Sequence, residues 1–166
     1  LAVAARRDPA FRDDIRRWRD HGLAVEEVPM VRGISPLRDW RDLLHLRRCF
    51  RRWRPAVVHT HSAKAGMLGR AAAAARRGTA IVHTPHCFPF AMRVAPPVRA
   101  LYRWLERTAA RWTDCLVCVC PAEERAASAA GIRPRGRTEI IPNGVAPPRE
   151  QPSPAAVAAA RAELGL

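Results

Sequence analysis

The sequence predicts an α/β protein built on a Rossmann-like open parallel sheet with helices on both faces. Short runs of β-branched and small apolar residues alternate with longer segments whose apolar residues recur at helical spacing. Proline, glycine and small hydroxyl residues mark the borders between these segments. Such alternation is typical of parallel sheets in which right-handed crossover helices cover the strands.

The clearest unit lies in the middle of the chain. Apolar runs at residues 56–60 and 80–84 enclose an alanine-rich segment at residues 63–77. Continuous apolar runs of about five residues are typical of strands buried on both faces, and the segment between them is long enough for a helix. We expect Ser62 to cap this helix and Gly78 to end it.

Two further strands are expected before this unit. Residues 1–5 have the composition of the end of a strand. Asp8-Pro9 supplies an N-cap followed by proline at the first helical position, which predicts a helix to about residue 21. Residues 23–29 alternate between apolar and polar side chains, which predicts the second strand.

A basic helix is predicted from Ser35-Pro36 to about Trp53, because the cap-then-proline pattern occurs again. Positive charge in its last turns suits the negative end of the helix dipole. A basic amphipathic helix can also dock on an anionic membrane, so two interpretations stay open: a solvated helix on the sheet, or a membrane contact. The arginines concerned are Arg47, Arg48, Arg51, Arg52 and Arg54.

The second half of the chain continues the alternation. Four apolar side chains at helical spacing follow Pro96-Pro97, namely Val98, Leu101, Leu105 and Trp112. In order, we expect a loop at 85–94, a helix from Pro96, a strand at 115–120, a helix from Pro121 to Gly131, and a strand at 138–141.

The chain is strongly basic, with a formal net charge of +14 over 166 residues. Lys64 is the single lysine among 29 basic residues, and the arginines are interleaved with aspartates along the chain, so the charge does not form a nucleic-acid-binding motif. We therefore expect no nucleic-acid partner, while peripheral contact with an anionic membrane remains open. No apolar run reaches the roughly 18 residues of a membrane span. Nothing at the start is typical of a signal peptide.

The five cysteines are odd in number and indicate a reducing compartment rather than a disulfide framework. Cys115, Cys118 and Cys120 lie in an apolar run and are expected to be buried free thiols. Alternation along a strand sends Cys115 and Cys118 to opposite faces, so this trio does not predict a zinc site.

Four of the six histidines lie at the ends of the two central strands, where parallel sheets collect ligands. The string from Val57 to Gly66 is Val-Val-His-Thr-His-Ser-Ala-Lys-Ala-Gly, and Val-His-Thr-Pro-His follows at residues 82–86. Together with Ile-Pro-Asn-Gly-Val at residues 141–145, in this order and spacing, these strings resemble the family 4 glycosyltransferases of GT-B fold.

The resemblance implies a retaining glycosyltransferase that moves a sugar from a nucleotide-sugar donor to a glycan or lipid-linked acceptor, without a cofactor or metal. Residues 1–145 would form the Rossmann-like acceptor-side domain, with its first strand–helix unit missing. Residues 146–166 would form a proline-rich linker and the start of a helix leading to a donor-binding domain. A cytoplasmic location, peripheral at the inner face of the membrane, would follow. A non-catalytic basic module that binds nucleic acid or anionic lipid is the alternative.

The resemblance also selects residues. His86 is the expected catalytic residue, because a histidine after this strand reaches the donor sugar and leaving phosphate in the family. An imidazole can donate to an anion and transfer a proton near neutral pH. The family commonly has glycine where Cys87 stands and aspartate where Ala146 stands. The expected substrate-binding residues are His61, Ser62, Lys64, Gly66, His83 and Asn143.

Two of these residues also have a physical rationale. Ser62 and Lys64 lie at a predicted helix N-terminus, and a hydroxyl and a cation at such a terminus form a natural anion site. A lysine is also unusual in a chain that otherwise uses arginine. The simpler alternatives are a first-turn surface lysine, a histidine satisfied by a backbone carbonyl, and a plain tight turn at Asn143-Gly144.

Overall fold

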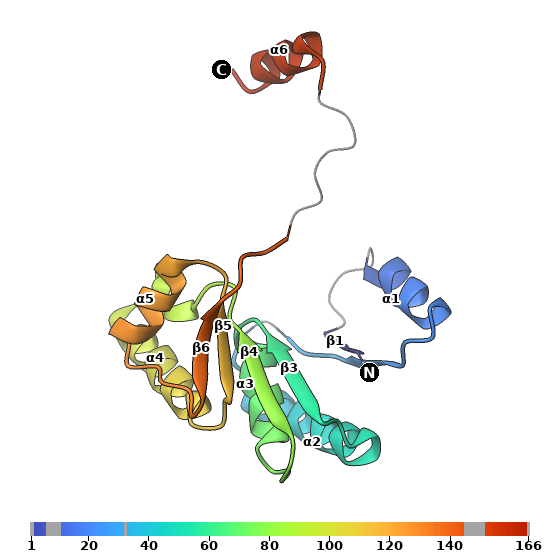
Figure 1. The fold of residues 1–166 in the computed structure, drawn as a ribbon, viewed down its shortest axis with the longest axis vertical. Helices are drawn as coiled ribbons and strands as arrows, with labels where there is room; N and C mark the ends of the chain where they lie inside the picture. The colour runs from blue at the N-terminus through green and yellow to red at the C-terminus, as the bar shows by residue number, and fades with distance from the viewer. Residues whose placement is uncertain (1, 6–10, 32, 145–151, 166) are drawn as a thin grey trace.

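The computed structural model describes residues 2–5, 11–31, 33–144 and 152–165. Strands and helices alternate through this part of the chain, as predicted (Figure 1). The strands are β1 (Ala2–Ala5), β2 (Val25–Val28), β3 (Val57–His61), β4 (Ala80–Thr84), β5 (Cys115–Cys118) and β6 (Arg137–Ile140). The helices are α1 (Phe11–Asp20), α2 (Pro36–Trp53), α3 (Ala63–Ala73), α4 (Pro96–Ala110), α5 (Pro121–Ala129) and α6 (Pro154–Glu163), with a short 3-10 helix, η1 (Pro89–Ala91), before α4.

Every strand pairing in the described residues is parallel, which confirms the predicted fold class. The strands form two sheets, β1-β2 and β3-β4-β5-β6, rather than the single open sheet that we expected. The difference arises at β3, which pairs with β4 on one side while no described strand pairs with its other side. Val57 on β3 is 56% exposed.

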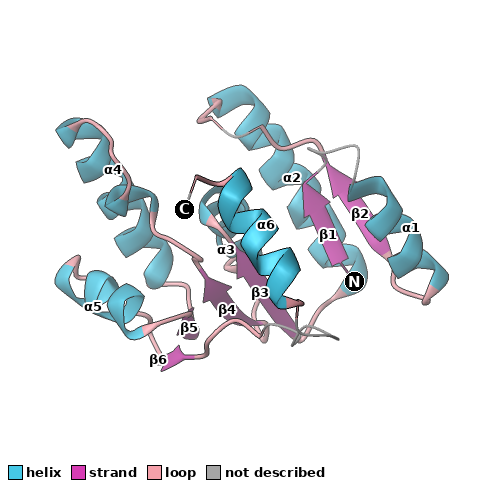
Figure 2. Ribbon diagram, turned by 90° about the horizontal axis from the view of Figure 1, so that it is seen from above, coloured by secondary structure: helices cyan, strands magenta, loops and turns pink. Residues whose placement is uncertain are grey.

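The helices lie on both sides of the strands. α2, α3 and α4 lie side by side on one face of the four-stranded sheet, and α3 contacts both of its neighbours (Figure 2). α1 lies on the other side of the β1-β2 sheet from α2 (Figure 1). Successive right-handed crossovers that advance in one direction place their helices on the same face. Among the described residues, the four-stranded sheet therefore has one face covered by helices and one open face.

The core fills the space between the covered face and its helices. One cluster joins β2, α2, β3, α3 and β4 through residues such as Val28, Phe50 and Ile81. A second cluster joins η1, α4, β5 and α5 through Phe88, Leu116 and others. Alternation along β3 follows this division, because Val58 and Thr60 are buried whereas Val57, His59 and His61 are exposed.

The observed helices match their predicted starts more closely than their predicted ends. Proline stands in the first turn of α2, α4, α5 and α6. The helix predicted over 63–77 ends at Ala73, and the strand predicted over 115–120 ends at Cys118, because Cys120 serves as the N-cap of α5. Asp8-Pro9, expected to open the first helix, lies outside the described residues.

The burial of the cysteines differs from the prediction. All five are free. Cys118 is buried, and burial raises the pKa of its thiol to about 12. The prediction was wrong for Cys115 and Cys120, which are partly exposed. Cys115 is the first residue of β5, and Cys120 lies beyond its end as the N-cap of α5.

Candidate functional site

The expected site residues lie where β3 and β4 end, at one edge of the sheet. Pairing places His61 opposite Thr84, so the loops after both strands start side by side. Alternation then separates their side chains: His59 and His61 lie on the open face, while Thr60 and His83 lie under the helices.

An exposed pair of histidines stands on the open face. His61 Nδ1 and His86 Nε2 are 3.0 Å apart, and their rings are stacked with centroids 5.3 Å apart. This contact confirms that both motif clusters lie at the same edge of the sheet. One nitrogen must donate and the other accept, so a neutral pair holds one shared hydrogen and leaves the two outer nitrogens for other partners.

His59 extends this pair into a group of three rings. Its ring centroid lies 4.2 Å from that of His61, and its Nε2 is 2.8 Å from the hydroxyl of Thr84. Burial first, and then the positive charge of His86, lowers the pKa of His59. Burial also lowers the pKa of His61, followed by repulsion from His59 and His86. These two imidazoles are therefore neutral at pH 7 and can accept or donate a hydrogen bond.

The backbone around this group is strained. Ser62 has φ 59° and ψ 175°, His86 has φ 56°, and Cys87 has φ 132°. Glycine adopts such angles freely, whereas other residues do so at a cost of roughly 1–3 kcal/mol. Among the described non-glycine residues, the other positive φ belongs to Arg54 at the C-cap of α2. Strain of this kind clusters at functional sites, and here it lies on both loops of the candidate site.

The covered side of the same strand ends contains a buried histidine. His83 is fully buried, and its Nδ1 lies 3.0 Å from the hydroxyl and 3.2 Å from the carbonyl of Thr60. Because that hydroxyl already donates to the carbonyl of Val82, Nδ1 is the donor nitrogen. Nε2 has no hydrogen-bond partner in the described residues. Burial, followed by the charge of Arg70, lowers the pKa of His83 to about 2.

A buried ion pair lies beside this histidine. Arg70 on α3 is fully buried, donates from Nη2 to Glu106 on α4 at 2.8 Å, and donates from Nε to the carbonyl of Gly66 at 3.0 Å. Gly66 itself faces the ring of His83, where an added Cβ would overlap with the imidazole. Gly66, Arg70, His83 and Glu106 thus form one packed group, which we call the buried node.

Lys64 does not present a free charge. Its ammonium lies 2.5 Å from a carboxylate oxygen of Asp39 on α2 and donates to the carbonyl of Gly33, and both side chains are mostly buried. The other carboxylate oxygen of Asp39 accepts from the backbone N–H of Ser35 at 3.0 Å. Lys64 therefore ties the start of α3 to the start of α2.

Ser62 and Asn143 differ from the remaining predicted residues. The side chain of Ser62 makes no capping hydrogen bond, so the expected cap of α3 is absent, although its backbone N–H donates to the carbonyl of Thr84. Asn143 is exposed in the segment after β6, two strands from β4. The structure thus brings His61 and His86 together, and it does not bring Asn143 to them.

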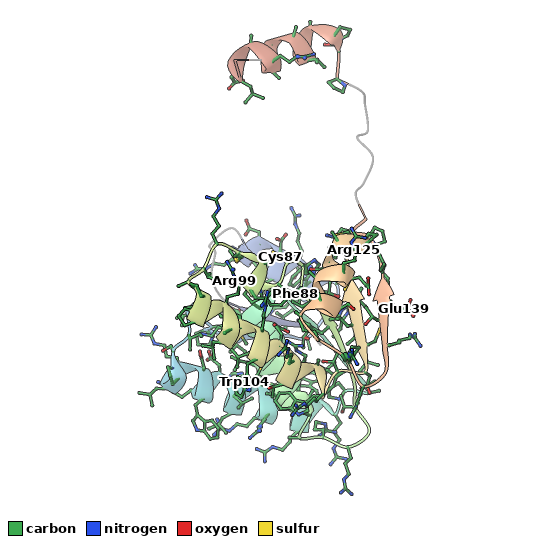
Figure 3. The ribbon with its side chains drawn as sticks, turned by 90° about the vertical axis from the view of Figure 1, so that its left-hand side faces the viewer. Cys87, Phe88, Arg99, Trp104, Arg125 and Glu139 are labelled. Carbon is green, nitrogen blue, oxygen red and sulfur yellow. The ribbon has the colours of Figure 1, made fainter. Side chains whose placement is uncertain are left out.

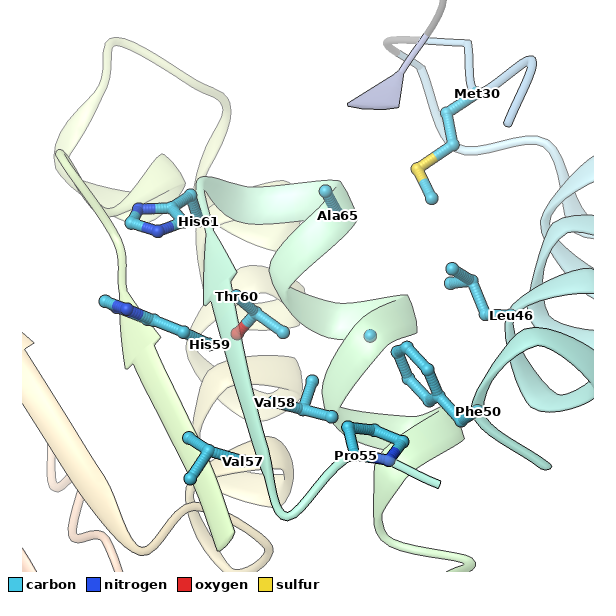
Figure 4. Close-up of a pocket in the computed structure, with 11 residues that line it drawn as sticks. Met30, Leu46, Phe50, Pro55, Val57, Val58, His59, Thr60, His61 and Ala65 are labelled. Carbon is cyan, nitrogen blue, oxygen red and sulfur yellow. The ribbon is translucent and has the colours of Figure 1, made fainter. Parts of the chain in front are cut away.

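A cavity of about 260 Å³ adjoins the site along the unpaired side of β3 (Figure 4). Apolar side chains of α2, among them Leu46 and Phe50, form one wall, and His59 and His61 lie at the strand. Pockets for small ligands usually have about 300–1,000 Å³, so this cavity lies near the lower limit.

One set of possible metal ligands lies outside the histidine group. In the part of the chain that the structure describes, the group with three donor atoms within 4.8 Å of one another is Glu26, His45 and Cys49, away from both motif loops. Neither the four histidines nor Cys115, Cys118 and Cys120 form such a group there.

Sequence reasoning missed two contacts. It did not select the contacts of His59, which lies two residues before His61 and therefore on the same face. It gave no signal for the Arg70–Glu106 pair, because arginine is so frequent in this chain that a buried one does not stand out.

The Rossmann-like parallel sheet has its polar residues at the carboxyl edge, where such sheets bind ligands. Two solved structures show the same fold. Sucrose-phosphate synthase from Thermosynechococcus elongatus aligns with 86% of this chain and 37% of its own, at 19% identity and a TM-score of 0.57. MurG from Acinetobacter baumannii aligns with 90% of this chain and 38% of its own, at 10% identity and a TM-score of 0.53.

The family follows from sequence. The family model described as a glycosyl transferase 4-like domain matches residues 1–144, so the chain belongs to that family. It is 34% identical over 129 residues to the UDP-Gal:alpha-D-GlcNAc-diphosphoundecaprenol alpha-1,3-galactosyltransferase of Escherichia coli. It is 38% identical over 88 residues to the putative glycosyltransferase EpsD of Bacillus subtilis. These matches cover 77% and 51% of the chain, but only 33% and 23% of the relatives.

Proposed function

We propose that this chain is the acceptor-side domain of a retaining glycosyltransferase that uses a nucleotide-sugar donor and a lipid-linked or glycan acceptor. The observation that carries the proposal is the contact between His61 and His86 on strained loops at the carboxyl edge. A second domain, of the size that the relatives add to the matched region, would hold most of the donor. The two domains together would enclose the reacting groups and exclude water.

In the proposed reaction the acceptor hydroxyl attacks the anomeric carbon on the face from which the nucleoside diphosphate leaves. A new carbon–oxygen bond forms, the bond from the anomeric carbon to the phosphate oxygen breaks, and the hydroxyl proton passes to the leaving phosphate. An imidazole N–H of His86 would donate to the charge that develops on that phosphate, while His61 fixes the orientation of the ring. Because the contact strengthens as the bond breaks, it would stabilise the transition state more than the bound donor.

The remaining predicted residues would support this arrangement. We propose that Gly66 and His83 shape the strand ends from the covered side, and that Lys64 positions the loop before α3 through Asp39. Ser62 would present its backbone at the site, and its strained angles favour that role. Asn143 would act at the junction with the second domain, because it follows the last strand.

The test uses the complete protein in which this chain occurs. Nucleotide sugars, with UDP-galactose first because the Escherichia coli relative is named for it, are offered with an N-acetylglucosamine diphospho-polyprenol acceptor. We expect sugar transfer, a product whose anomeric configuration by NMR equals that of the donor, and no transfer by the 166-residue chain alone. Inversion would contradict the mechanism. Absence of transfer from every common donor to lipid-linked and glycan acceptors would contradict the function.

The rival function is a non-catalytic basic module, since the net charge is +14. Such a module would bind nucleic acid or anionic lipid with a strong salt dependence and would not bind sugar nucleotides. Calorimetry of the complete protein with UDP-sugars and with duplex DNA at two salt concentrations separates the two functions.

We also propose that α2 contacts an anionic membrane from the inner side of the cell. Leu37 and Trp40 are 84% and 57% exposed. Three arginines of the same helix line a surface hollow: Arg38, Arg41 and Arg48. Replacing Arg48, Arg51 and Arg52 by glutamine should weaken binding to anionic liposomes, most clearly at low salt. Unchanged binding at low salt would contradict this contact. The described helices include none long and apolar enough to cross a bilayer, so the contact would lie at the surface.

A further inference from the structure

A second exposed surface with apolar and basic side chains lies on α4. Trp104, Leu101 and Val98 are 60%, 42% and 37% exposed, although large apolar side chains are normally buried. Trp104 lies on the side of the molecule turned to the viewer in Figure 3. Met92, just before this helix, is 59% exposed. We call these four residues the α4 patch.

Helical spacing orders the exposed side of α4 into two flanks. Val98, Leu101 and Leu105 recur at three and four residues and form an apolar flank. Arg103 and Arg107 are four residues apart and form a basic flank, which Arg111 continues. At 100° per residue, Trp104 falls between the flanks. The opposite side of the helix, with Glu106, Ala109 and Ala110, is buried against the core.

Within residues 92–113, no exposed acidic side chain offsets the positive charge of this surface. Residues 92–113 contain five arginines and a single acid, Glu106. That acid is buried and paired with Arg70, so it does not face the exposed arginines. Arg103 and Arg111 are exposed, and the guanidinium of Arg103 lies over the ring of Phe90 at 5.7 Å.

We propose that the α4 patch docks on an anionic lipid bilayer. An interfacial helix inserts its apolar side shallowly among the acyl chains while arginines bind the lipid phosphates, and tryptophan suits the boundary between them. Charge selects this occupant over an ordinary protein partner, because the surface is uncompensated along the whole helix. Anionic lipid headgroups supply the complementary charge.

The position of α4 gives this contact a consequence. α2 and α4 flank α3 on one side of the sheet, and both helices begin where strands end, at the edge that holds His61 and His86 (Figure 2). The α4 patch and the start of α2 would therefore form two membrane-contact sites that hold this edge of the sheet at the bilayer. Resting on the proposed function, this geometry brings a lipid-linked acceptor to the site from the membrane.

Vesicle flotation of the full chain tests the docking. The probes are vesicles of phosphatidylglycerol with phosphatidylcholine, and vesicles of phosphatidylcholine alone. We expect binding to the anionic vesicles only, weakened about tenfold by Arg103→Gln with Arg111→Gln, and weakened severalfold by Trp104→Ala with Leu101→Ala. All four positions are exposed, so folding should persist, and far-UV circular dichroism checks it.

The matched control removes the same charge elsewhere. Arg125→Gln with Arg133→Gln alters two exposed arginines on α5 and the loop after it, and should weaken binding by less than about twofold. An equal loss in this control would show that net charge alone drives binding and would overturn the proposal. Unchanged vesicle binding by both α4 double variants would also overturn it, as would a shift of oligomeric state without any change in vesicle binding.

A second readout links docking to the acceptor and separates this proposal from the proposed function. In the complete protein, Trp104→Ala with Leu101→Ala should slow transfer to a long-chain polyprenol acceptor in vesicles, and should leave transfer to a short-chain water-soluble acceptor unchanged. If no transfer occurs with any acceptor, the proposed function fails while the flotation result stands. If the rates of transfer to both acceptors fall equally, the link between the α4 patch and the acceptor is wrong.

Discussion

The two faces of the sheet differ most at the ends of β3 and β4, where neighbouring residues of one short strand lie in opposite environments. On the covered face, the buried node fixes Gly66, Arg70, His83 and Glu106 under the helices. On the open face, His59, His61 and His86 gather on strained loops and contact one another. Histidines one residue apart in register, such as His61 and His83, thus have opposite surroundings.

The comparison teaches that the same residue type serves stability on one face and is available for chemistry on the other. A buried imidazole with one donor bond and a pKa near 2 cannot exchange a proton at neutral pH. The exposed imidazoles of His61 and His86 can donate or accept hydrogen bonds with a bound ligand.

The largest effect is expected at the ion pair of the buried node. Arg70→Ala leaves Glu106 buried without a partner and should lower the free energy of unfolding by about 3–5 kcal/mol, measured by urea denaturation. Replacing both residues, with Arg70→Met and Glu106→Leu, should cost much less. The exposed pair of Arg137 and Glu139 is the control, and Arg137→Ala should cost less than about 1 kcal/mol. Equal costs for the two pairs would remove the distinction.

Gly66→Ala should lower the free energy of unfolding by about 1–3 kcal/mol. The added methyl group would overlap with the ring of His83, which is too buried to move aside, and this outweighs the better helix propensity of alanine. Gly33→Ala is the matched control, because an added Cβ there has open space. A gain in stability at Gly66 would mean that the node is looser than described.

Stability should fall with acidification because of His83. Its pKa is about 2 in the folded chain and about 6.5 in the unfolded chain, so below pH 6.5 the unfolded state binds a proton that the folded state does not. The contribution is fully present above pH 6.5 and should be about 1.4 kcal/mol smaller at pH 5.5. The lowered pKa values of His59 and His61 act in the same direction. NMR should show no titration of the His83 ring between pH 5 and 7.5, whereas a titrating ring would place it in solvent.

The smallest effect is expected on the open face, and its sign is reversed. Cys87→Gly removes strain at φ 132° and should raise the free energy of unfolding by roughly 1 kcal/mol. Ser128→Gly, at an exposed helical position, should lower it by roughly 0.5 kcal/mol, since glycine destabilises helices. Thermal denaturation measures both. A loss at position 87 would mean that cysteine fits this turn.

The sequence was sufficient for the fold and for part of the site, for physical reasons. Periodicity and proline placed the described strands and α-helices within a few residues, because these signals are local. They missed η1, which lies in the segment expected to be a loop, because a single 3-10 turn has no periodic pattern. The sequence also predicted that His61 and His86 lie close together, because parallel strands end at one edge of a sheet. The sequence could not predict that His83 is buried while His61 and His86 are exposed, because burial depends on which helices cover which face. It could not foresee the partner of Lys64 either, because Asp39 lies on another helix, 25 residues earlier in the chain.

The most direct test of the central claim compares His86→Ala with Arg70→Ala in the complete protein, by steady-state kinetics and thermal denaturation together. We predict that His86→Ala lowers kcat and kcat/KM together by about a hundredfold, with an unchanged melting temperature. Arg70→Ala should act mainly by lowering the melting temperature. His21→Ala, at an exposed histidine on the loop after α1, should change neither. If His86→Ala destabilises the protein as Arg70→Ala does, or lowers only donor affinity while kcat holds, the open face does not carry the chemistry and the account is wrong.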